Sequence, residues 1–179
     1  AALASCGGLR IARLANAIIT LGCTPAEATW RAGVEVFTLG ATKNGVLSTD
    51  AIVSLDAEVA HQLTYRLKRA GHVASKMRFQ SVQLDAYPTD DRWLTTARAA
   101  NDAAARLAAG LRDLGLEPLV PVEANMIHLD VDPAVADRWE AAGLLFYRID
   151  GPTVRLVTSF ATTDDDVDAA LAVIADGLR

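Results

Sequence analysis

The chain has 179 residues, of which 51% are hydrophobic and 22% are charged, as is typical of a folded globular protein rather than a disordered one. Its net charge is −5, its pI is near 5.1 and no basic stripe is evident, so we expect neither nucleic acid nor an anionic membrane as partner. No apolar run reaches the ~20 residues of a membrane-spanning helix.

The two cysteines, Cys6 and Cys23, form no CxxC pair and no disulfide framework, which favours a cytoplasmic location. Residues 1–5 are small and apolar, with no basic leader. Two interpretations of this start stay open: a signal-peptide remnant, or a chain that begins part-way through a longer protein.

Apolar periodicity and turn residues predict alternating helices and strands. In the first half they predict helices over residues 12–21, 25–32, 57–69 and 75–86, and strands over residues 34–39 and 51–55. In the second half they predict helices over residues 91–114, 134–142 and 164–178, and strands over residues 116–120, 126–131, 144–149 and 154–158. We place a domain boundary inside the long helix, at about residue 95, followed by a small α/β domain over residues 96–179.

Lys43 is placed unusually, between Gly40 and Gly45 at the end of an apolar strand. Partial burial there is expected to lower the pKa of its amine, as a Schiff-base lysine needs for attack on a carbonyl. A solvated loop lysine is the alternative.

Two arginines are candidate anion ligands. Arg13 lies at a predicted helix start, where a cation opposes the helix dipole, although an ordinary surface arginine is the more frequent case for such a pattern. Arg155 lies in an apolar strand on the same face as Val157, so it either pairs with an acid or receives an anion. Asn125 at a strand entry is an ordinary turn residue, and the three histidines lack metal-ligand spacing, so we expect no metal site.

Four segments of the chain, in this order, resemble the low-specificity L-threonine aldolases of the aromatic amino acid β-eliminating lyase/threonine aldolase family. They are RLANA at residues 13–17, GVEVFTLGATKNG at 33–45, KRAGH at 68–72 with SKMR at 75–78, and VRLVTSF at 154–160. The resemblance runs from about residue 12 to the end, a C-terminal portion of the family. It implies an α/β fold: the end of a fold-type I pyridoxal-phosphate-dependent large domain, residues 1–95, followed by the small domain.

The resemblance also implies roles for individual residues. Lys43 matches the lysine that forms the Schiff base with pyridoxal 5′-phosphate, and Thr42 and Arg78 match positions near the cofactor. Arg13 and Arg155 match arginines that hold the amino-acid carboxylate, Arg13 being close to the cofactor as well. The implied reaction is cleavage of L-threonine or L-allo-threonine to glycine and acetaldehyde, in a homo-oligomer.

The chain departs from the family before residue 12. Residues 1–11 match nothing in it, and Arg10 stands where the family has the Asp that pairs with the pyridine nitrogen. We therefore expect the chain on its own to be a truncated or inactive form. Two alternatives stay open: a remnant that folds or dimerises without cofactor, and another fold-type I lyase acting on β-hydroxy or aromatic amino acids.

Overall fold

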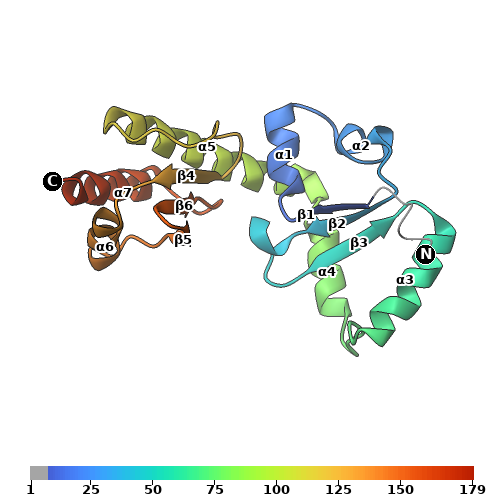
Figure 1. Cartoon of the computed structure of the whole chain (residues 1–179). Coiled ribbons are helices and arrows are strands. Elements are labelled where there is room, and N and C mark those ends of the chain that lie inside the picture. Colours follow the sequence, from blue (N-terminus) through green and yellow to red (C-terminus); the bar gives the residue numbers. More distant parts are fainter. Residues whose placement is uncertain (1–7) are drawn as a thin grey trace. The chain divides into compact units, whose positions relative to one another are not determined.

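A computed structural model describes residues 8–179 of the chain, with side chains from residue 12 onward. It divides into two compact units, Ala1–Thr95 and Thr96–Arg179 (Figure 1). Cys6 and the expectations for residues 1–7 lie outside the described part.

A three-stranded sheet, ordered β1-β2-β3, forms the centre of the first unit. β1 (Gly8–Ile11) runs parallel to β2 (Val36–Gly40), and β3 (Asp50–Ser54) runs antiparallel to β2. β2 and β3 confirm the two predicted strands. The sequence pattern does not predict β1, which pairs Arg10 with Thr38.

Four α-helices accompany this sheet. They are α1 (Leu14–Leu21), α2 (Pro25–Ala28), α3 (Ala57–Arg69) and α4 (Arg78–Ala86). At the start of α2, the Thr24 hydroxyl accepts from the Glu27 N–H at 3.2 Å, and the Glu27 carboxylate accepts from the Thr24 N–H at 2.8 Å. This capping box confirms the predicted helix start.

Two predicted helices of the first unit are shorter than expected. The helix predicted over residues 25–32 ends after one turn, because Thr29 leaves the helical region (φ −129°, ψ −99°) and its hydroxyl donates to the Pro25 carbonyl at 2.6 Å. The chain continues as the 3₁₀ turn η2 (Trp30–Ala32). Residues 75–77 form turns rather than the first turn of α4.

The second unit joins an antiparallel sheet, ordered β4-β6-β5, to three helices. Its elements are most of α5 (Arg92–Asp113), then β4 (Met126–Asp130), α6 (Pro133–Ala141), β5 (Tyr147–Asp150), β6 (Thr153–Val157) and α7 (Asp164–Gly177). Alternate residues of β4 and β6 point into one core with side chains of the three helices, so the period of two in the sequence selects the buried face. The buried strand residues are Ile127, Leu129, Val154 and Leu156.

Trp139 of α6 lies at the centre of this core and is fully buried. Its indole Nε1 donates to the Ile174 carbonyl of α7 at 3.2 Å, and its ring meets Phe146 edge to face at 6.1 Å between centroids. The only polar atom of the indole thus has a partner, so burying the whole ring leaves no hydrogen bond unmade.

The strand predicted over residues 116–120 is wrong, and the one predicted over 144–149 begins only at Tyr147. Both predicted strands start with a leucine that instead completes a helix end. Leu116 donates to the Leu111 carbonyl and Leu144 to the Trp139 carbonyl, at 2.9 and 3.0 Å. Each follows a glycine of positive φ, which is the Schellman arrangement, so the apolar residue after the glycine closes the helix and packs on the core.

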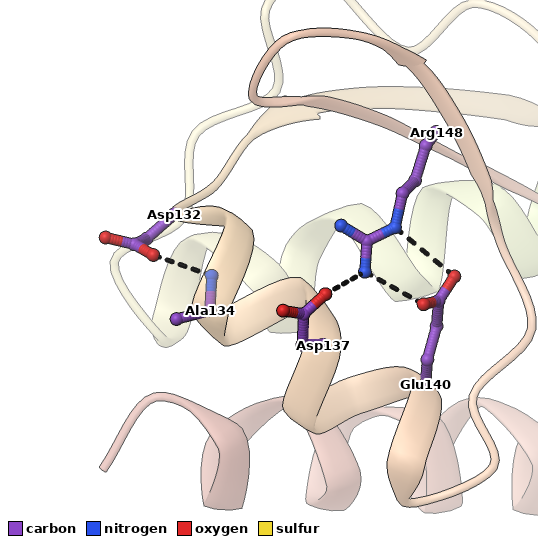
Figure 2. Close-up of polar contacts among 5 residues, drawn as sticks. All are labelled: Asp132, Ala134, Asp137, Glu140 and Arg148. Atoms are coloured by element: carbon purple, nitrogen blue, oxygen red, sulfur yellow. Dashed lines mark hydrogen bonds and ion pairs between the residues drawn. The ribbon is translucent and has the colours of Figure 1, made fainter.

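An arginine joins the edge strand β5 to helix α6 (Figure 2). Arg148 donates to Asp137 at 2.7 Å and to both carboxylate oxygens of Glu140 at 2.8 and 3.3 Å. These hydrogen bonds, led by that to Glu140, raise the pKa of Arg148. Figure 2 also shows Asp132 accepting from the Ala134 N–H at 2.7 Å as the N-cap of α6.

Over residues 8–179, no helix is both long and apolar enough to cross a bilayer. Within the same part of the chain, no group of three or more His, Cys, Asp or Glu side chains is arranged to hold a metal ion. Cys23 is a half-buried free thiol.

Candidate active site

Lys43 lies on a short 3₁₀ turn, η3 (Thr42–Asn44), directly after β2. Ala41 before the turn is fully buried, and its N–H is shared between the Thr49 carbonyl at 3.3 Å and Asp50 Oδ1 at 3.1 Å. Gly45 ends the turn at φ 100°, a conformation that favours glycine. The glycine that drew attention to Lys43 in the sequence therefore has a backbone role.

The two sides of the loop that contains Lys43 are joined through Thr42. Its hydroxyl donates to the Thr49 carbonyl at 3.2 Å and accepts from the Thr49 N–H at 3.1 Å. This pair of bonds closes the loop between β2 and β3. In this chain the Thr42 hydroxyl therefore makes these hydrogen bonds within its own loop.

Asn44 occupies the buried position of the turn. Its amide Nδ2 donates to the Tyr87 hydroxyl and to the Trp93 carbonyl, both at 2.7 Å. Burial raises the pKa of Tyr87, the hydrogen bond from Asn44 lowers it and the negative charge of Asp50 raises it. Tyr87 is therefore held as a neutral phenol that can accept from the amide.

The Lys43 side chain is exposed, so the partial burial expected from the sequence is wrong for this chain. The physical reason is the tight turn, which points consecutive side chains in different directions and gives the buried one to Asn44. Lys43 lines a cavity of about 680 Å³. Other residues at its wall come from the ends of β2, β3 and α3 and from the segment before α4, and include Gly40, Asp50, His72 and Met77.

Gly40 allows the backbone before α1 to approach this cavity closely. A Cβ at residue 40 would lie 3.3 Å from Ala12 Cα and 3.4 Å from both the Ala12 carbonyl oxygen and Asp50 Oδ1. Such contacts are tighter than most side chains tolerate. Ala12 also lines the cavity, so Gly40 brings residue 12 and the lysine turn to one place.

His72 reaches the cavity through the end of α3. The Gly71 N–H donates to the Lys68 carbonyl at 3.1 Å, and the His72 N–H donates to the Leu67 carbonyl at 2.9 Å. With Gly71 at φ 77°, this is again a Schellman ending. His72 is exposed. It stands here because it follows the glycine that stops the helix.

The described residues that line the cavity do not include the other four site residues proposed from the sequence, which are Arg13, Thr42, Arg78 and Arg155. Arg13 is half-buried at the N-cap of α1, one residue beyond Ala12. Arg78 is exposed at the start of α4, with its guanidinium 5.4 Å from the centre of the Phe79 ring. The cavity wall therefore joins Lys43 to Met77, the neighbour of Arg78, but not to Arg78 itself.

Arg155 belongs to the second unit. Its guanidinium carbon lies 4.5 Å from the centre of the Tyr147 ring, and these two residues are register partners on β6 and β5. Its Nε is buried and has no hydrogen-bond partner among the described residues, where no carboxylate pairs with it either. Of the two sequence interpretations, pairing with an acid is thus not found in the described part of the chain.

Two residues of the site were not predicted as functional candidates from the sequence. They are Asp50, one residue before the predicted strand at 51–55, and Tyr87, one residue after the predicted helix at 75–86. The only available signal was Asn44 itself, a polar residue beside the lysine. Its partners are 43 and 49 residues further along the chain, a distance over which a sequence pattern carries no information.

No model of a known family matches the chain. Low specificity L-threonine aldolases from Pseudomonas sp. and Pseudomonas aeruginosa are each 40% identical to it over 141 residues, 78% of this chain. The chain spans 41% of the length of these curated relatives.

Solved structures show the same fold. A threonine aldolase from Leishmania major matches with a TM-score of 0.83 at 22% identity, over 96% of this chain and 52% of that one. An aromatic amino acid beta-eliminating lyase/threonine aldolase from Exiguobacterium sp. 255-15 matches with a TM-score of 0.72 at 21% identity, over 95% and 52%. The α/β fold expected from the sequence is confirmed by these structures. The chain is a homologue of the low-specificity L-threonine aldolases and corresponds to a C-terminal portion of them.

Proposed function

We propose that the first unit carries part of the pyridoxal 5′-phosphate site of an aldolase that cleaves L-threonine or L-allo-threonine to glycine and acetaldehyde. The observation that carries this proposal is Lys43. A hydrogen-bonded turn presents it to a cavity of about 680 Å³, in a chain 40% identical to low specificity L-threonine aldolases.

The residues around Lys43 fit the aldehyde end of this cofactor. A lysine amine condenses with an aldehyde by forming a C=N bond and releasing one water, which requires an accessible nitrogen beside a space for the ring. Lys43 is exposed and lines such a space. When bound, the cofactor supplies an electron sink for the electron pair left on the α-carbon of the glycine fragment.

Arg155 is our candidate for the substrate carboxylate. Its planar guanidinium can donate two parallel hydrogen bonds to a carboxylate, and its buried Nε is without a partner among the described residues. The guanidinium carbon also lies 4.5 Å from the centre of the Tyr147 ring, a cation–π contact that favours this position of the side chain. For Arg13, Arg78 and Thr42, the support is the family resemblance together with the place of Arg13 beside Ala12 at the cavity wall.

Arg10 limits what we expect of the chain alone. It occupies β1, opposite Thr38 of the cavity wall, at the position where the family resemblance expects an aspartate. An arginine has the opposite charge to that aspartate, and a positive charge near a pyridine nitrogen disfavours its protonation. We therefore expect cofactor capture by Lys43 with little turnover of threonine, the remnant that binds no cofactor being the alternative outcome.

We also propose that the chain acts in the cytoplasm as a homo-oligomer. The free thiol of Cys23 is compatible with a reducing compartment. Exposed apolar side chains on the first unit, such as Leu47 and Phe79, are surfaces that a second copy could cover.

An absorbance titration tests the proposal. Pyridoxal phosphate is added to the chain and to Lys43→Ala, and the visible band of the protein-bound cofactor is recorded. We expect the band only in the unmodified chain, because the amine of Lys43 forms the bond.

Product assays then separate the related enzyme classes. Glycine and acetaldehyde from L-threonine favour an aldolase, whereas pyruvate from serine indicates another fold-type I lyase. An equal band in Lys43→Ala would contradict the proposal, and no band in either folded protein would favour the remnant.

A further inference from the structure

We propose that Asn44 is a positioning residue, which fixes the turn that carries Lys43 and thereby sets where the Lys43 amine lies in the cavity. Its consequence for chemistry rests on the proposed function. Its structural part concerns only hydrogen bonds within the first unit.

The Asn44 amide is used fully as a donor. Both hydrogens of Nδ2 are taken, one by the Tyr87 hydroxyl and one by the Trp93 carbonyl, each at 2.7 Å. The side chain is only 6% exposed, so water cannot replace either acceptor without opening the structure. A buried amide with unmade bonds costs more than the bonds themselves contribute, so the amide strongly favours this one arrangement.

The other hydrogen bonds described for the turn are local. η3 is three residues long, and its local bonds join it to Ala41 and Thr49 in the same loop. A further hydrogen bond between this loop and α4, from the Ser48 N–H to the Gln83 side chain at 3.2 Å, is exposed to solvent. Asn44 is therefore a buried link between the lysine turn and a distant part of the unit.

The acceptors for Asn44 come from an unusual corner between α4 and α5. Asp90 and Asp91, in the 3₁₀ turn η4 (Thr89–Asp91), have φ values of 54° and 55°. Two successive left-handed residues other than glycine are uncommon and cost backbone energy. They turn the chain back so that the Trp93 N–H donates to the Tyr87 carbonyl at 3.2 Å.

This corner presents both acceptors to one amide. The rings of Tyr87 and Trp93 meet edge to face at 5.9 Å between centroids, and both side chains are buried. The phenol oxygen and the Trp93 carbonyl thus come from a rigid, closed loop. Because Asn44 adjoins Lys43, a rigid anchor for one residue fixes the backbone of the other.

The test uses the full chain and a matched control. Asn44→Ala removes both bonds, Asn44→Asp keeps the shape but replaces the donor by an acceptor, and Tyr87→Phe removes one acceptor. Asn125→Ala is the control, because Asn125 is equally buried and donates to the Thr158 carbonyl at 2.7 Å, but lies in the second unit.

The first measurement needs no cofactor. Amide hydrogen exchange is followed by mass spectrometry in peptides covering residues 41–46, where Asn44 and Val46 both donate to the Ala41 carbonyl. We expect about tenfold faster exchange in Asn44→Ala and Asn44→Asp, a smaller rise in Tyr87→Phe and none in Asn125→Ala. Unchanged exchange in the folded Asn44 variants would overturn the proposal, and if these do not fold, unchanged exchange in Tyr87→Phe would do so.

The second measurement reads the lysine itself. The chain has three lysines, Lys43, Lys68 and Lys76, so pyridoxal phosphate can be trapped with borohydride and each site quantified by peptide mapping. The preference for Lys43 over the other two should fall about tenfold in the Asn44 variants, which a general loss of stability in a folded protein would not produce. An undiminished preference would overturn the positioning role. Absence of any preference in the unmodified chain would instead contradict the proposed function, and the exchange measurement would then decide the positioning role.

Discussion

The core of the second unit and the Lys43 turn of the first unit are stabilised by different kinds of contact. The second unit has one continuous apolar core, in which residues of β4, β6, α5, α6 and α7 surround Trp139. The Lys43 turn of the first unit is fixed mainly by hydrogen bonds through Thr42, Asn44 and Asp50. Exposed apolar side chains do not distinguish the units, since Leu47 of the first is 87% exposed and Leu145 of the second is 92% exposed.

This difference separates stability from positioning. Apolar packing is nondirectional and tolerates exchange of similar volumes, so it stabilises a unit without fixing one side chain to a fraction of an ångström. Hydrogen bonds are directional and weak in net free energy, so they can fix a turn while adding little stability. A lysine that must meet a ligand is served better by the second kind of contact.

The largest effect is expected from Trp139→Ala. Removing a fully buried indole from the core should lower the free energy of unfolding by about 3–5 kcal/mol, as seen for large-to-small changes at buried aromatic sites. Urea denaturation followed by circular dichroism measures it. Hydrogen exchange at residues 41–46 should stay unchanged, because the hydrogen bonds described for that turn lie within the first unit. Faster exchange there would show that the two units do not differ as described.

A smaller effect on the free energy of unfolding is expected from replacing either of two glycines by alanine. In Gly177→Ala the new methyl would overlap Trp139 Cδ1 and Nε1, whereas in Gly110→Ala it would meet the flexible end of Leu171. We expect Gly177→Ala to cost about 1–3 kcal/mol through overpacking. Gly110→Ala should cost less, because the leucine can move and alanine is favoured by about 1 kcal/mol in a helix. Equal midpoints of urea denaturation would argue against a rigid indole at the centre of the core.

The smallest effect on the free energy of unfolding is expected from removing the capping threonine of either capping box. Thr163→Ala at the start of α7 should lower the free energy of unfolding by about 1 kcal/mol at neutral pH. Thr24→Ala should cost less, because α2 is a single turn that buries no side chain. Both changes are measured by urea denaturation.

The same boxes predict a pH dependence. Bonds from the Thr163 N–H and hydroxyl lower the pKa of Asp166, and equivalent bonds from Thr24 lower that of Glu27. A lowered folded-state pKa stabilises the fold above the unfolded-state pKa, and that contribution is lost as the pH falls through the folded-state value. The difference between Thr163→Ala and the unmodified chain should therefore shrink on acidification. A constant difference would mean that the carboxylate of Asp166 takes no part in the cap.

Local signals in the sequence predicted most helices and strands. Thr24 with Glu27, Asp56 and Thr163 mark helix starts by side-chain bonds to nearby backbone N–H groups, as the structure shows. The strand predicted at residues 116–120 is wrong and the one predicted at 144–149 begins too early, because an apolar residue after glycine can close a helix as well as open a strand. Local composition does not distinguish the two, since the choice depends on the packing of Leu116 and Leu144 against a core formed by distant segments.

The candidate site also has parts that local sequence predicts and parts that depend on distant segments. The lysine, its flanking glycines and the arginines are visible as residue types, so the sequence yields candidates. The buried amide of Asn44 and its partners, Tyr87 and Trp93, depend on a long-range contact, and so does the exposure of Lys43. The prediction of a partly buried lysine failed because the turn, and not the composition around it, decides which side chain points inward.

The central claim is that Lys43 is the lysine that bonds the cofactor. Borohydride trapping of pyridoxal phosphate on the unmodified chain, followed by peptide mapping of its three lysines, tests it most directly. The account predicts a reduced adduct concentrated on Lys43, with little on Lys68 or Lys76. An adduct spread evenly over the three lysines, or none on Lys43, would contradict it.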